Sequence, residues 1–97
     1  MSKRRILKKE ISYTAGDLFT EVLIYAQCMP NVDQEKVDPL LTRILEMSDK
    51  FVLRAGHPDG KDNHKIIRAF YQKLRADFNN EVDTIAAEIS SLFKAEQ

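Results

Sequence analysis

The sequence predicts an all-α protein, a single up-down-up bundle of three amphipathic helices. Apolar residues recur every three or four positions through most of the chain, which is the period of a helix with one buried face. Only 3 Gly and 3 Pro occur among 97 residues, too few for a β fold dense in turns. A chain of this length builds one hydrophobic core, so residues 1–97 are expected to form one domain.

The first helix is predicted over about residues 4–28, with residues 1–4 frayed. Its apolar stripe steps by 4-4-3-4-4 through Leu7, Ile11, Ala15, Leu18, Val22 and Ala26. A later start is the alternative, because Thr14 followed by Asp17 resembles a helix cap and Gly16 costs about 1 kcal/mol inside a helix. The longer helix is preferred because the stripe continues backwards without a change of phase.

The second helix is predicted over about 39–55, with a start nearer residue 33 as the alternative. Asp38 can cap the free N–H groups, and Pro39 suits the first helical position. Gly56 followed by Pro58 is a typical C-terminal stop.

The third helix is predicted over 62–94, capped by Asp62 or Asn63, with a length on the order of 50 Å. Asn79-Asn80 coincides with an extra step of four in the apolar stripe, which makes this point a candidate bend. The helix is longer than the second one, so its C-terminal apolar residues are expected to need a partner surface. Self-association as a homodimer is predicted through Val82, Ile85, Ile89, Leu92 and Phe93.

The charges cancel overall, 15 basic against 15 acidic, but they are unevenly placed. Residues 1–9 contain five basic residues and no acid. In an up-down-up bundle this end also receives the end of the second helix and the start of the third, which gives it a net charge of about +6 and leaves −6 at the other end. The two interpretations are a solubilising terminal turn and a contact with an anionic partner, either nucleic acid or an acidic protein, through Lys3, Arg4, Arg5, Lys8 and Lys9.

No catalytic or cofactor motif is present: the sequence contains no G-x-S-x-G, P-loop or G-x-G-x-x-G pattern. The chain is therefore predicted not to be an enzyme and to need no cofactor. His57, Asp59, Asp62 and His64 are potential metal ligands, but their spacing matches no strong zinc signature, and turn and cap roles explain the two aspartates. No metal site is predicted.

Cys28 is the sole cysteine, which excludes an intrachain disulfide and favours the cytoplasm. It is expected to pack as a small apolar residue. The eight aromatic residues lie on the predicted helices and are expected in the core or an interface. No apolar run approaches the roughly 18 residues of a membrane span.

Short motifs spread along the chain resemble a small uncharacterised helical family of Bacteroidetes bacteria. They are Lys9 and Ile11 before Asp17-Leu18-Phe19, then His57-Pro58, then Asp77-Phe78-Asn79. The resemblance implies a compact helical fold and no assigned activity. The sequence thus predicts a helical protein–protein interaction or structural module, with a nucleic-acid- or ribosome-associated protein as the alternative.

Overall fold

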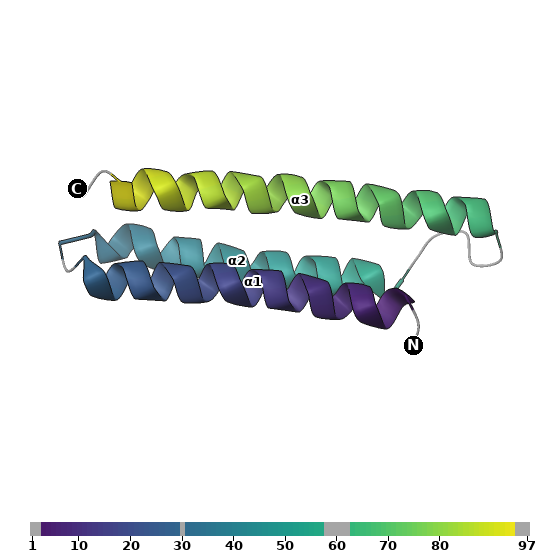
Figure 1. The fold of residues 1–97 in the computed structure, drawn as a ribbon, viewed down its shortest axis with the longest axis horizontal. Helices are drawn as coiled ribbons and strands as arrows, with labels where there is room; N and C mark the ends of the chain where they lie inside the picture. The colour runs from purple at the N-terminus through teal and green to yellow at the C-terminus, as the bar shows by residue number, and fades with distance from the viewer. Residues whose placement is uncertain (1–2, 30, 58–62, 95–97) are drawn as a thin grey trace.

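The computed structural model describes residues 3–29, 31–57 and 63–94, and these form an all-α bundle of three helices. The helices are α1 (Lys3–Cys28), α2 (Gln34–Ala55) and α3 (His64–Lys94). Consecutive helices run in opposite directions, so the topology is up-down-up (Figure 1). The molecule is a rod of 53 × 20 × 17 Å with a radius of gyration of 15.9 Å. A compact domain of this length has a radius of gyration of about 12–13 Å, so the bundle is clearly elongated.

Helix α1 is one continuous helix from Lys3, which agrees with the earlier of the two starts predicted for it. Gly16 lies within it on the exposed face, and no atom lies within 4 Å of the position where a side chain would begin. The glycine weakens the helix but does not break it, because five buried residues of the stripe from Leu7 to Val22 hold both halves against the core.

Helix α2 begins at Gln34, so the predicted cap at Asp38 is wrong and the earlier start is right. Asp33 is the N-cap: its carboxylate accepts a hydrogen bond from the Glu35 backbone N–H at 2.9 Å. Pro39 therefore lies inside the helix, where it cannot donate to the carbonyl four residues earlier. The added turn buries Val37 completely, and this burial offsets the lost hydrogen bond.

Helix α3 begins after Asn63, whose side-chain oxygen accepts from the N–H groups of Lys65 and Ile66 at 3.0 and 3.3 Å. The helix passes through Asn79-Asn80 without interruption, so the candidate bend does not break it (Figure 1). Both asparagines are exposed, and the Asn80 carbonyl additionally accepts a hydrogen bond from the Thr84 hydroxyl at 2.9 Å.

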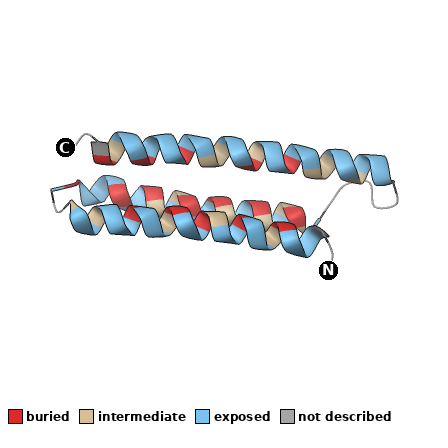
Figure 2. Cartoon of the chain, in the orientation of Figure 1, coloured by how far each residue is buried: buried red, intermediate tan, exposed pale blue. Residues whose placement is uncertain are grey.

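The core is one apolar column along the rod axis (Figure 2). Helices α1 and α2 pack most closely, and α3 lies over them with more of its contacts on α2. Within the described residues no buried side chain is polar or charged. Beyond the residues of α1 already named, the column contains Val32, Val37, Leu40, Ile44, Met47, Phe51, Ala55, Leu74, Phe78, Ile85, Ile89 and Phe93.

Ion pairs fix the register between α2 and α3. Arg43 pairs with Glu88, Lys50 with Glu81 at 3.3 Å and Arg54 with Asp77 at 3.2 Å. The two residue numbers of each pair add up to 131, as expected for antiparallel helices with one constant register. By the same rule the last residue of α2 lies level with residue 76, so residues 64–75 of α3 extend beyond α2.

This register corrects the predicted self-association surface. Ile85, Ile89 and Phe93 are buried within the chain, and Val82 and Leu92 are partly buried against the same core. The prediction failed because the extra length of α3 lies at its N-terminal end, so that α2 runs alongside residues 76–94 and covers the C-terminal half of α3. Tyr25 of α1 also packs on Phe93, with ring centroids 5.1 Å apart. The uncovered part of α3 is its N-terminal end.

Candidate anion-binding groove

An open groove of about 520 Å³ lies between the first turn of α1 and the projecting start of α3. One wall comes from α1 and the other from α3, whose first turns extend past the start of α1 (Figure 1). We call it the basic groove; its lining residues are Arg4, His64, Ile67, Arg68, Tyr71, Gln72 and Arg75.

Tyr71 anchors this part of α3 to the rest of the bundle. Its hydroxyl donates to the carbonyl of Ala55, the last residue of α2, at 3.3 Å. Its ring meets that of Phe70 edge to face at 5.3 Å. Tyr71 and Ile67 are half-buried and supply the apolar part of the groove. The hydrogen bond to Ala55 thus ties the projecting part of α3 to the end of α2.

The groove is positively charged because its lining contains three arginines and no acidic residue. Arg75 is neutralised by Glu10 of α1, with Nη1 2.9 Å from Oε2. Within the part of the chain that the structure describes, no ion pair involves Arg4 or Arg68. The N-terminus of α3 adds a partial positive charge at the same place. An anionic group in the groove would therefore meet two arginines and a helix N-terminus.

The five basic residues predicted to contact an anionic partner do not act as a unit. Arg4 lines the basic groove, whereas Arg5 and Lys9 are exposed elsewhere on α1. Lys8 is half-buried, and a methyl group on Gly56 would lie 3.1 Å from its Nζ. Its ammonium group therefore faces the C-terminal end of α2, where the helix carbonyls favour a cation. The side chain of Lys3 lies outside the described residues.

Lys8 also explains why Gly56 follows α2. The backbone of Gly56 is right-handed, with φ −82°, so the position does not require glycine for conformational reasons. The nearest atoms to a side chain at this position belong to Lys8. The glycine thus leaves space for a cation from α1, which the usual helix-stop interpretation does not reveal.

His64, Ile67 and Tyr71 were not predicted as members of a binding site. The sequence suggests His64 only as a potential metal ligand and Tyr71 only as an aromatic residue of the core or an interface. The available signal is the greater length of the third helix, which the sequence indicates but does not assign to the correct end. The start of the third helix is already expected at the basic end of the bundle.

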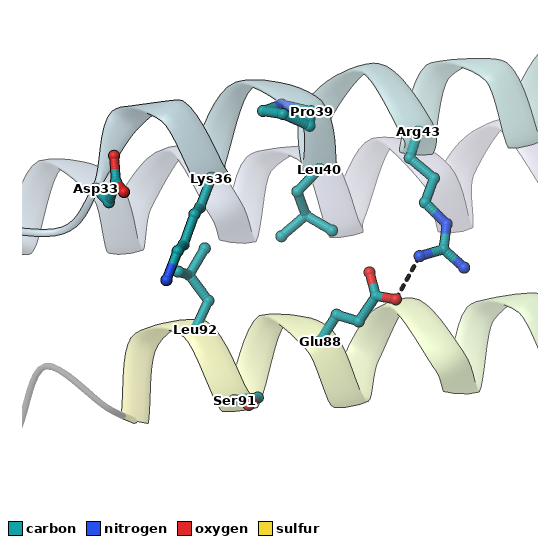
Figure 3. Close-up of a pocket in the computed structure, with 8 residues that line it drawn as sticks. All are labelled: Asp33, Lys36, Pro39, Leu40, Arg43, Glu88, Ser91 and Leu92. Carbon is teal, nitrogen blue, oxygen red and sulfur yellow. Dashed lines mark hydrogen bonds and ion pairs between the residues drawn. The ribbon is translucent and has the colours of Figure 1, made fainter.

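A second groove of about 520 Å³ lies between the start of α2 and the end of α3 (Figure 3). Most of its polar groups already serve the fold: Asp33 caps α2, and Arg43 binds Glu88. Leu40 and Leu92 point toward each other between the two helices (Figure 3). Its remaining polar groups are Lys36 and Ser91, so it offers less for recognition than the basic groove.

The structure adds little support for the other candidate sites considered in the sequence. Asp59 and Asp62 lie outside the described residues. Among the residues described, no three His, Cys, Asp or Glu side chains come close enough to share a metal ion. Cys28 is exposed, which contradicts its expected packing; the stripe passes through Ala26 and Met29 instead. Tyr13 is not in the core, because 69% of it is exposed.

Comparison with protein-family models, curated proteins and solved structures finds no match to this chain. The resemblance to a Bacteroidetes family stays a prediction. Searched over its described residues, the bundle has no helix with the length and hydropathy needed to cross a bilayer.

Proposed function

We propose that this chain is a small helical protein–protein interaction module that binds an acidic protein surface in the basic groove. One observation carries the proposal: Arg4 and Arg68 are far apart in the sequence, on different helices, yet they line one groove around Ile67 and Tyr71. Protein interfaces combine an apolar centre with a polar rim, and arginine is enriched in them.

An acidic protein surface fits this groove better than nucleic acid does. Tyr71 is bonded to Ala55 and packed against Phe70, so its ring is committed to the fold rather than free to stack on bases. The chain carries no net charge, whereas nucleic-acid binding gains most of its affinity from many phosphate contacts. The ion pair of Arg75 with Glu10 shows a carboxylate bound at the edge of the groove.

The test is a fluorescence anisotropy titration with two probes. One is a short labelled peptide with Glu and Leu at helical spacing, and the other is a labelled single-stranded oligonucleotide. At about 50 mM salt we expect the peptide to bind, with affinity that decreases as salt screens the charges. The R4E/R68E variant should bind it at least about tenfold more weakly, which corresponds to about 1.4 kcal/mol.

The matched control is K36E, which reverses one charge in the groove at the opposite end of the rod. It should bind the peptide as the wild type does, and helical circular dichroism should be unchanged in all variants because these side chains lie outside the core. Lys8 is left intact, since it packs against Gly56. If only the oligonucleotide binds, with a salt slope of about −0.7 per phosphate, the nucleic-acid alternative replaces the proposal. Failure of both probes to bind refutes both functions.

A further inference from the structure

One row of α1 carries a charge pattern that is complementary to itself. Arg5, Lys9, Tyr13, Asp17 and Glu21 follow one another at steps of four, so they form a continuous ridge along the helix surface. All five are exposed. Two basic residues precede the central tyrosine and two acidic residues follow it. A 180° rotation that reverses the helix direction about Tyr13 therefore exchanges the basic positions with the acidic ones.

Tyr13 is the most exposed large hydrophobic residue in the described part of the chain, at 69%. Beside it on the next turn, Gly16 carries no side chain, and no atom lies within 4 Å of its missing Cβ. The surface thus presents a large aromatic ring directly next to an empty position. An exposed aromatic residue with a hollow beside it is a typical centre for a helix–helix contact.

We propose that this ridge binds a second copy of the chain, forming an antiparallel homodimer with its twofold axis at Tyr13. Each Lys9 then lies opposite Asp17 of the other copy. The tyrosine of each copy enters the space beside Gly16 of the other. Packing between such i±4 rows is the commonest arrangement of helix pairs in globular proteins. Every contact occurs twice, as a twofold interface requires.

The charges favour this occupant over an unrelated helix. The rod is basic at one end and acidic at the other, so an antiparallel second copy brings each basic end nearer to the acidic end of the other copy than to its basic end. A parallel copy would place like charges together. The proposal is independent of the proposed function, because the basic groove and the ridge share no residue. It also differs from the predicted dimer through α3, whose apolar residues are buried.

The experiment is sedimentation equilibrium of charge-swap variants at low salt. The wild type should have twice the 11.2 kDa mass of one chain, with a dissociation constant in the micromolar range that is typical of small interfaces. K9D and D17K should each dimerise at least about tenfold more weakly, because each places like charges across the axis twice. An equimolar mixture of K9D and D17K should restore the dimer, and so should the K9D/D17K double variant.

In the proposed register, residue 9 of one copy faces residue 17 of the other. Only a heterodimer of the two variants places opposite charges at both of these contacts, so recovery in the mixture is specific to this register. K36D introduces the same charge change away from the ridge and should dimerise normally. A wild type that remains a monomer at about 0.5 mM, well above any micromolar dissociation constant, would overturn the proposal. The same holds if the mixture fails to recover, or if R4E/R68E dissociates the dimer, which would indicate head-to-tail contact through the basic groove.

Discussion

The two ends of α3 differ in the contacts that hold them against the rest of the bundle. Its C-terminal half lies between α1 and α2, buries Ile85, Ile89 and Phe93, and pairs Glu81 and Glu88 with cations of α2. Its first three turns extend past α2 and contain no fully buried residue before Leu74. They are attached mainly through Tyr71 and Arg75.

The difference indicates where stability and recognition reside. Apolar burial contributes most of the folding free energy, so the covered half of α3 stabilises the bundle. The projecting half contributes less to stability. It carries Arg68, which forms no ion pair within the described residues, beside half-buried apolar residues. The side chains that contribute little to folding stability are therefore the ones that a partner can contact.

The largest expected effect comes from removing an aromatic ring in each region. Phe51 is fully buried and meets Phe78 edge to face at 5.3 Å, so F51A should lower the free energy of unfolding by about 3–5 kcal/mol. Phe70 is half-buried on the projecting segment, and F70A should cost about 1 kcal/mol. Urea denaturation measures both. Equal losses would show that the projecting segment is part of the core.

The sequence predicts the number of helices and their buried faces because both depend on local periodicity. The stripe from Leu7 to Val22 and the residues Phe51, Leu74 and Phe78 are all found in the core. The start of α2 is harder to predict, since Asp33 and Asp38 are both good caps and only the burial of Val37 in the folded bundle decides between them.

The register between α2 and α3 determines the candidate site. Because residue 55 lies level with residue 76, α2 covers the C-terminal half of α3 and leaves its N-terminal end uncovered. The basic residues of the first turn are visible in the sequence, but the opposite wall of the groove, including His64 and Ile67, depends on this register. Long-range packing was the missing information.

The next effect in size concerns the cap at the start of α2. D33A removes the acceptor of the Glu35 N–H and should destabilise the protein by about 1 kcal/mol. D38A is the matched control: its carboxylate only accepts an exposed hydrogen bond from Gln34, so the change should remain within about 0.5 kcal/mol. Thermal denaturation of the two variants side by side tests this. A larger effect of D38A would support a helix that begins at Pro39.

The smallest expected effect concerns the ion pairs between α2 and α3. Arg54 is less exposed than Lys50, and the side chains of Arg54 and Asp77 are 29% and 38% exposed. Arg54 also lies 5.2 Å from the centre of the Phe51 ring. Lys50 and Glu81 are 57% and 35% exposed. Partly exposed pairs contribute about 0.2–1 kcal/mol, so a double-mutant cycle should place the Arg54–Asp77 coupling near the upper value and the Lys50–Glu81 coupling near the lower one.

The salt dependence of the coupling energy distinguishes its electrostatic part from the packing of Arg54 on the Phe51 ring. Raising the ionic strength from about 0.1 to 1 M shortens the Debye length from about 10 to 3 Å and should remove most of the Lys50–Glu81 coupling. The Arg54–Asp77 coupling should decrease less, because Arg54 is less exposed than Lys50. If both couplings are zero at low salt, the constant register of α2 and α3 is set by apolar packing alone, and the ion pairs follow from it.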